Sequence, residues 1–337
     1  MAYTTIDDPS AHFQTATYTG NGSSQSVVND GNSDLQPDWL WIKERSSTSG
    51  HILKDTSRGV NNSLNSHGTD AESANSNQVT SINSDGFSVG TDNGTNQSSV
   101  TMVAWQWKAN GGTTSSNTDG TITSTVQANT TAGFSIVTFT GTSSNVTTGH
   151  GLNQAPEIFF AKSRVSNSTN WNTYTSVIDG SLDYLFLNST DAAGNASNSL
   201  PTSSVLYTNQ TDSSVAYCFH SVQGYSKIGR YKGNGSTDGA FVYTGFKPAF
   251  VLFKQTSGTE WWGIIDATRD PVNQGDKYLK ANDSVAEGTG LNFDLLSNGI
   301  KFRHADAAFN GNGSTYIYMA FAEHPFVSSK GVPVTAR

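Results

Sequence analysis

Residues 35–45 read LQPDWLWIKER, residues 152–164 read LNQAPEIFFAKSR, and residues 246–254 read FKPAFVLFK. In each segment a proline precedes an apolar run that is rich in aromatic or β-branched residues and closes on a lysine. Short apolar runs of this composition are typical of buried β-strands. The anchors Pro37, Pro156 and Pro248 therefore indicate three copies of one β-rich unit.

Similar strands flank this segment in every copy. The segments before it are residues 13–22 (FQTATYTGNG), 134–141 (FSIVTFTG) and 225–235 (YSKIGRYKGNG). The closing segments are residues 102–107 (MVAWQW), 215–219 (VAYCF) and 316–321 (YIYMAF), in which we align Ala104, Ala216 and Ala320. The dipeptides Asp85-Gly86 and Asn298-Gly299 predict hairpin turns, because both tolerate positive φ.

The composition favours an all-β fold. Only 34% of the 337 residues are hydrophobic and 14% are charged, so Ser, Thr, Asn and Gly dominate, and these residues disfavour helices. An aromatic content of 11% argues against disorder, because those rings can build a core. Repeats of about 100 residues are too long for a solenoid, so each copy is expected to bury its own core. We predict three tandem, divergent β-sandwich units of a jelly-roll or lectin-like kind, arranged as beads in a row.

Unit boundaries follow from the repeats and the polar tracts. We expect unit 1 at residues 1–109, a linker at 110–119, unit 2 at 120–223, unit 3 at 224–326 and an extended C-terminal tail at 327–337. The linker is predicted from NGGTTSSN at residues 110–117. No comparable tract precedes Tyr225, so units 2 and 3 are expected to pack closely.

Several functional classes are disfavoured. A net charge of −8 without a Lys/Arg-rich run argues against nucleic acid as a partner, and no apolar run is long enough to span a membrane. We expect no metal and no cofactor, because the histidines are scattered and the one cysteine, Cys218, is expected to be buried. The N-terminus lacks the pattern of a secretory signal, so folding in a cytoplasm is expected, and Asn-x-Ser/Thr triplets are not expected to carry glycans.

An Asp-x-x-Arg pair occurs in two copies, as Asp55 with Arg58 and as Asp266 with Arg269. Such a pair is compatible with a catalytic acid beside an electrophile. Its repetition favours a structural role instead, because an enzyme needs one converging constellation, whereas repeated modules reuse a turn-fixing charge pair.

Tryptophans are the candidates for external contact. Trp261 and Trp262 are adjacent, so in a strand they point to opposite faces, and one of them is exposed unless another unit or subunit covers it. Trp171 follows a comparable polar loop in the second copy. An exposed indole can stack on a sugar ring, but packing at an interface or an edge strand is the more common role.

The chain resembles virion proteins of tailed bacteriophages, common among phages of marine bacteria, that carry a repeated lectin-like module. The resemblance rests on residues 3–13 (YTTIDDPSAHF), 18–22 (YTGNG), 37–43 (PDWLWIK) and 316–326 (YIYMAFAEHPF). It covers nearly the whole chain and implies concanavalin-type or related β-sandwich modules. Such proteins are usually labelled tail-fibre-like or virion structural, and the resemblance carries over no catalytic residue.

From these observations we predict a non-enzymatic protein of the virion surface, assembled in the host cytoplasm and present in several copies. It would dock on other virion proteins as a capsid decoration or tail accessory module, because no heptad or collagen-like shaft of a long fibre occurs. The alternatives are a receptor-binding lectin for host surface glycans and a polysaccharide-degrading enzyme. The tail with Pro325, Phe326 and Pro333 is expected to be extended and to dock on a neighbouring protein.

Overall fold

The structure is a computed structural model that describes residues 2–142 and 146–334. It is nearly all-β, with 42% strand and 3% helix, which confirms the predicted fold class. The described residues include no helix with the length and apolarity needed to cross a bilayer.

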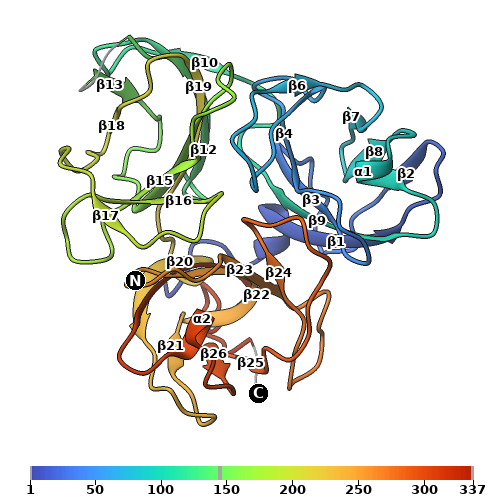
Figure 1. Ribbon diagram of the computed structural model, residues 1–337, viewed down its shortest axis with the longest axis vertical. Helices are drawn as coiled ribbons and strands as arrows, with labels where there is room; N and C mark the ends of the chain where they lie inside the picture. Colours follow the sequence, from blue (N-terminus) through green and yellow to red (C-terminus); the bar gives the residue numbers. More distant parts are fainter. Residues whose placement is uncertain (1, 143–145, 335–337) are drawn as a thin grey trace.

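Figure 1 shows three lobes around a common middle. The first lobe contains η1 (Pro9–Ala11), β1 (Phe13–Thr19), β2 (Gln25–Val27), β3 (Trp39–Glu44), β4 (Ile52–Asp55), β5 (Asn62–Ser63), β6 (Ser73–Ala74), β7 (Val79–Ile82), β8 (Phe87–Val89), α1 (Asn93–Asn96) and β9 (Thr101–Trp107). The second contains β10 (Ser115–Asn117), β11 (Ser124–Asn129), β12 (Phe134–Thr140), β13 (Val146–Gly149), β14 (Ile158–Ser163), β15 (Asn172–Thr175), β16 (Asp183–Phe186), β17 (Gly194–Asn195), β18 (Val205–Thr208) and β19 (Ser213–Phe219). The third contains β20 (Ser226–Lys232), β21 (Phe241–Tyr243), β22 (Phe246–Gln255), β23 (Gly263–Asp266), β24 (Leu279–Lys280), β25 (Phe293–Leu296), β26 (Gly299–Phe302), α2 (Ala307–Asn310) and β27 (Thr315–Pro325).

The main antiparallel sheets of the lobes share one strand order. It is β1-β9-β3-β4 in the first lobe, β12-β19-β14-β15 within the eight-stranded sheet of the second, and β20-β27-β22-β23 in the third. A smaller sheet faces each main sheet to form a sandwich: β2-β8-β7, β13-β18 and β21-β26-β25. The sandwich character is therefore shown, whereas the predicted division into three units with the bounds given above stays a prediction.

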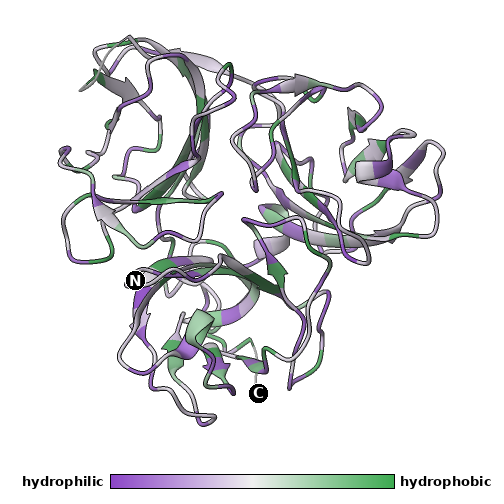
Figure 2. Ribbon diagram, in the orientation of Figure 1, coloured by the Kyte–Doolittle hydropathy of each residue, from purple (hydrophilic) through white to green (hydrophobic). Residues whose placement is uncertain are grey.

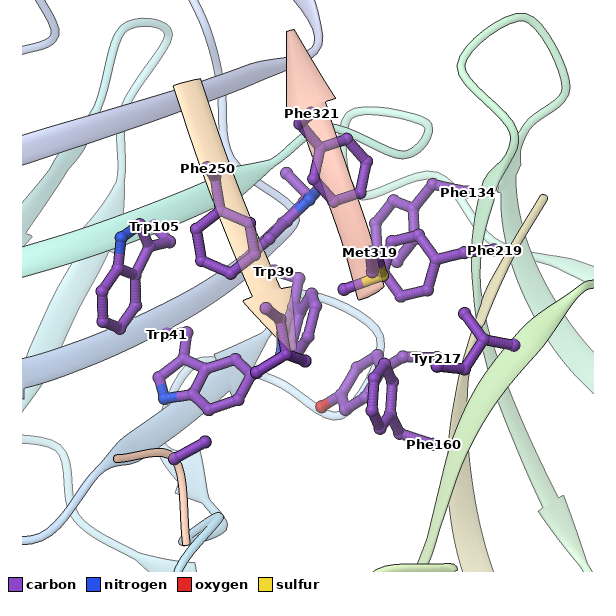
Figure 3. Close-up of a cluster of buried hydrophobic side chains, with 14 of the residues drawn as sticks. Trp39, Trp41, Trp105, Phe134, Phe160, Tyr217, Phe219, Phe250, Met319 and Phe321 are labelled. Atoms are coloured by element: carbon purple, nitrogen blue, oxygen red, sulfur yellow. The ribbon is translucent and has the colours of Figure 1, made fainter. Parts of the chain in front are cut away.

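The lobes share a central aromatic core. It draws on all three main sheets, through residues such as Trp39 of β3, Phe219 of β19 and Phe321 of β27 (Figure 3). The Trp39 and Tyr217 rings stack with centroids 4.3 Å apart, and the Phe219 and Phe321 centroids are 5.8 Å apart. The expected beads in a row are therefore wrong, because one face of every main sheet needs the other two lobes to cover it.

Each lobe also has a core of its own, on the opposite face of the main sheet. Successive residues of β3 alternate between the two faces, so Trp39 and Trp41 enter the central core while Leu40 and Ile42 pack inside the first lobe. All six residues of β3 and all six of β14 are buried. Burial on both faces explains the continuous apolar runs of the sequence. Figure 2 shows green, hydrophobic stretches along the inner strands, whereas the loops mix hydrophilic and intermediate residues.

Strand registers give the equivalence of the copies residue by residue. Trp39 pairs with Trp107, Ile158 with Phe219, and Phe250 with Phe321, and each of Trp39, Ile158 and Phe250 lies two residues after its anchor proline. By this register Ala104 and Ala216 are equivalent. Ala320 lies on the equivalent strand but at the register of Gln106 and Cys218, so its predicted alignment is wrong by two residues. A two-residue slip keeps the side chain on the same face and is therefore hard to detect in a sequence.

The segment expected to be a linker is anchored to the first lobe. The Asp38 carboxylate accepts hydrogen bonds from the backbone N–H groups of Ala109 (2.7 Å), Gly111 (2.8 Å) and Gly112 (2.7 Å). Residues 115–117 then form β10, which pairs with β11 of the second lobe. The segment therefore runs from the first lobe to the second with both of its ends hydrogen-bonded, and the predicted bounds of the linker, 110–119, stay a prediction.

The C-terminal segment folds back instead of extending. Pro325 is buried at the end of β27. Beyond it the Val334 N–H donates to the Phe326 carbonyl at 3.2 Å, beside a bridge between Val327 and Pro333. Ser329 N–H also donates to Asp7 at 2.7 Å. The expected extended tail is thus wrong for residues 327–334, and residues 335–337 lie outside the described residues.

Candidate functional site

The first Asp-x-x-Arg pair lies at the junction of the first and second lobes. The Asp55 and Arg58 side chains are fully buried and form an ion pair, and the Arg58 backbone N–H donates to Asp55 at 2.7 Å. Arg58 also donates to Glu72 at 2.7 Å, and Glu72 accepts from Arg164 of the second lobe at 2.6 Å. The Tyr217 hydroxyl, again from the second lobe, donates to Asp55 at 2.7 Å.

The second pair repeats this arrangement between the third and first lobes. Arg269 donates to Asp266 at 2.5 Å and to Glu287 at 2.9 Å, and Glu287 accepts from Arg45 of the first lobe at 2.9 Å. Trp105 Nε1 donates to Asp266 at 2.9 Å, in the place that Tyr217 takes at the other junction. Both pairs therefore join lobes, a contact that the sequence argument for a local turn did not anticipate.

The third junction, between the second and third lobes, keeps the backbone contact without the ions. At the first two junctions the N–H of Glu72 donates to the Arg164 carbonyl and the N–H of Glu287 to the Arg45 carbonyl, both at 2.7 Å. Ala193 donates to the Thr256 carbonyl at 2.9 Å in the same way. Three equivalent junctions therefore close the ring of lobes, each lobe contacting the other two.

Ring nitrogens make a second set of three junction contacts. Trp171 Nε1 donates to the Asn65 carbonyl at 2.8 Å, and Trp262 Nε1 donates to the Phe186 carbonyl at 2.9 Å. In the first lobe the residue before β4 is His51, whose Nε2 lies 2.9 Å from the Lys280 carbonyl. Trp171 and Trp262 are at most 1% exposed, so a glycan contact is wrong for both: neighbouring lobes cover them, as an interface role requires.

Trp261 remains a candidate for external contact. It is half-buried, stacks on Tyr278 with ring centroids 4.9 Å apart, and lies 5.2 Å from the Lys280 ammonium. It lines a pocket of about 130 Å³ together with Tyr278, His304 and Asp306. The two adjacent tryptophans thus point to opposite faces as expected, one toward the central core and one toward this pocket.

Three buried lysines form a feature whose chemistry the sequence reasoning missed. Lys43, Lys162 and Lys254, which close the three apolar runs, each donate to the carbonyl of the next residue and to that of the fourth residue on, at distances of 2.5 to 3.2 Å. Burial lowers the pKa of each ammonium to about 8. The repeated lysine was a visible signal, and its function is to fix the turn that follows the central strand.

Cys218 is completely buried on β19, as predicted, and burial raises the pKa of its thiol. Among residues 2–142 and 146–334, no group of three or more His, Cys, Asp or Glu side chains is placed to hold a metal ion.

A group of hollows surrounds the N-terminal segment, between the second and third lobes. Three adjoining hollows of about 370, 630 and 490 Å³ are all lined by Tyr3 and Gln223, and we name them together the N-terminal cleft. The Tyr3 hydroxyl donates to the Gly245 carbonyl at 2.7 Å, which holds the segment against the residues that follow the edge strand β21. On that edge strand Phe241 and Tyr243 are 46% and 53% exposed.

Comparison with known proteins gives one family. No curated protein matches the chain. A family model described as a domain of unknown function, DUF7483, matches residues 8–325 and so spans all three lobes. The chain therefore belongs to the DUF7483 family.

Proposed function

We propose that the protein is a non-enzymatic structural component of a tailed-bacteriophage particle, which docks on other virion proteins as a capsid decoration or tail accessory module. The observation that carries this proposal is the closed ring of three similar lobes around one shared core. Such a body acts as a rigid unit, and multiple copies of it on a particle add binding area at little entropic cost.

The charged side chains support the same conclusion. Asp55, Arg58, Asp266 and Arg269, the residues best suited to acid–base or electrophilic chemistry, have fully buried side chains that are paired at the junctions. Buried ions that hydrogen-bond to one another stabilise a particular arrangement of lobes when their partners are in place. We therefore assign them to assembly of the ring.

The N-terminal cleft is the proposed docking surface. The edge strand β21 presents two exposed aromatic rings, Tyr243, which lines the cleft, and Phe241, which lies two residues before it on the same strand. Aromatic residues are enriched at the centres of protein interfaces. An edge strand also offers unpaired backbone groups to a strand of the partner. The folded-back residues 327–334 border the same cleft through Ser329, Lys330 and Gly331, so the C-terminal segment belongs to this surface.

The test uses particles grown with a tagged copy of the protein. The double substitution Phe241→Ser and Tyr243→Ser is expected to leave a folded protein that no longer copurifies with particles. Val28 of the first lobe is 65% exposed and is equivalent to Tyr243. The preceding residue, Val27, pairs with Phe87, just as Val242 pairs with Ile300. Phe87 and Ile300 each follow an equivalent Asp-Gly or Asn-Gly turn. Val28→Ser is therefore the matched control, and it should copurify normally.

Three outcomes would overturn the proposal. If the double variant joins particles normally, the cleft does not dock. If particles that lack the protein are equally stable but fail to adsorb to host cells, receptor binding replaces docking as the function. Release of reducing ends from host envelope polysaccharide by the purified protein would support the enzymatic alternative instead.

A further inference from the structure

A second pocket, in the second lobe, has the form of a small-ligand site. It has a volume of about 240 Å³, and β15 and β16 supply its floor. Tyr174 pairs with Tyr184, and Asn172 with Phe186, so these four side chains stand together on one face of the two-stranded ladder. Its lining is completed by Ala196 and Asn209.

The same place exists in the other two lobes, with different contents. Tyr278, which directly precedes β24, corresponds to Tyr184 by register. The Phe186 carbonyl accepts from Trp262 and the Lys280 carbonyl contacts His51 at equivalent junctions, and each of these carbonyls lies two residues after the tyrosine. In the third lobe the place is the narrower pocket of Trp261 and Tyr278. In the first lobe a buried lysine, Lys54, stands at the register of Tyr174 and extends its Nζ to the Asn61 and Asn75 carbonyls at 3.2 and 3.3 Å.

The three lobes therefore place different side chains at the same position of the fold. The first lobe has a buried, hydrogen-bonded lysine at this position, whereas the second lobe lines a pocket there with aromatic rings. In the second lobe the wall of the pocket includes the small side chain of Ala196, three residues after the junction residue Ala193. In the third lobe the equivalent wall residue is Gly290, three residues after Glu287, which has no side chain. An aromatic floor with a few amides is the usual composition of a specific small-molecule site.

From this geometry we infer that the pocket of the second lobe binds one pyranose ring of a neutral glycan. The C–H face of a pyranose packs on aromatic rings such as Tyr184 and Phe186, which are half-buried and so remain reachable. The amides of Asn172 and Asn209 can both donate to and accept from sugar hydroxyls. The six lining residues include no carboxylate and no ammonium group, which favours a neutral ligand over an anion. A volume below the roughly 300–1,000 Å³ of drug-sized sites limits the ligand to about one ring.

This inference is independent of docking at the N-terminal cleft, since none of the six residues lines that cleft. A protein that docks through one face and holds a sugar in the second lobe would bring a glycan to the particle surface. Either property can fail without the other.

The experiment is saturation-transfer NMR on the full chain with four neutral probes. These are methyl α-glucopyranoside, methyl α-mannopyranoside, methyl β-galactopyranoside and N-acetylglucosamine, each at about 10 mM, since a single ring is expected to bind with a dissociation constant of roughly 1 mM. At least one probe should receive saturation from the protein. Asn172→Ala and Tyr184→Ala should each weaken its binding by roughly tenfold, as expected for loss of a hydrogen bond or a stacking face.

Controls separate this pocket from other surfaces. Tyr243→Ala, on the docking edge, should leave the signal unchanged, and thermal unfolding of every variant checks that the fold is kept. The inference is overturned if none of the four probes is saturated, or if the signal survives both Asn172→Ala and Tyr184→Ala. It is also overturned if Tyr278→Ala alone abolishes the signal, because the sugar would then occupy the third lobe.

Discussion

His51 occupies the place in the first lobe that Trp171 and Trp262 occupy in the other two. Its Nδ1 accepts from Trp41 Nε1 at 2.7 Å, so its Nε2 must carry the proton that is donated to the Lys280 carbonyl. This arrangement requires a neutral ring. Burial, with smaller contributions from Lys43 and His67, lowers the pKa of His51 well below its ordinary value.

The stability of the protein should therefore fall in mild acid. In the unfolded chain His51 takes up a proton below about pH 6.5, whereas the folded ring stays neutral until its lower pKa is reached. Stability from this residue is complete above about pH 6.5 and is lost below it by up to about 1.4 kcal/mol per pH unit. Urea unfolding between pH 7 and pH 5 measures this loss. His51→Gln should reduce the slope by about one proton. Equal slopes in the variant and the native chain would show that His51 does not titrate as described.

The ion networks at two junctions lead to a second prediction at the residue scale. Arg58→Ala leaves Asp55 and Glu72 without their buried partner and should lower the free energy of unfolding by about 3–5 kcal/mol. The third junction has an uncharged set of residues in place of this ion network. Its residues at the positions of Asp55, Arg58, Glu72, Arg164 and Tyr217 are, in that order, Thr175, Ile178, Ala193, Thr256 and Met319.

Exchanging the whole network should therefore cost less than breaking it. The combined variant Asp55→Thr, Arg58→Ile, Glu72→Ala, Arg164→Thr and Tyr217→Met gives this junction the composition of the third one. Urea unfolding should place it above Arg58→Ala in stability, because no buried charge is left unpaired. A combined variant less stable than Arg58→Ala would contradict the equivalence of the junctions.

Among the elements, each of the central strands β3, β14 and β22 is followed by a turn whose carbonyls accept hydrogen bonds from a buried lysine. Lys162→Met keeps the length of the side chain but leaves the Ser163 and Ser166 carbonyls without their donor. We expect the free energy of unfolding to drop by about 1–3 kcal/mol. Lys232→Met, on an exposed position of β20, is the matched control and should have no measurable effect in the same urea titration. Equal stability of Lys162→Met and the native chain would mean that the turn holds without the lysine.

The strands and the face each residue occupies were predictable because period and composition are local properties. The continuous burial of β3 and β14 follows from runs such as WLWIK, and the anchor prolines mark the equivalent register in all three copies. The offset of Ala320 was not predictable, because alternation of faces is unchanged by a two-residue slip.

The candidate site was only partly predictable from the sequence. The adjacent Trp261 and Trp262 were correctly assigned to opposite faces. The burial of Trp171 depends on Asn65, which lies 106 residues away, and no local pattern encodes that contact. The pocket of the second lobe was missed because Asn172, Tyr184 and Asn209 meet only through the pairing of β15 with β16 and the packing of a later loop.

For the whole molecule, the decisive feature is the shared core. Three sheets that each have an outer apolar face can cover these faces by dimerisation, by stacking in a row or by closing a ring. All three arrangements require the same pattern of apolar residues along the strands, so the sequence does not distinguish them. The aromatic residues of β3, β19 and β27 meet at one centre, so all three lobes are needed to exclude water from it. The lobes should therefore unfold together, although a chain of this length would otherwise be expected to show separate steps.

Differential scanning calorimetry of the full chain tests this cooperativity most directly. We predict one transition with a calorimetric enthalpy of about 240 kcal/mol, at about 0.7 kcal/mol per residue, equal to the van't Hoff enthalpy. Two or three resolved transitions, or a van't Hoff enthalpy near one third of the calorimetric value, would show that the lobes unfold independently and would contradict the ring built around one core.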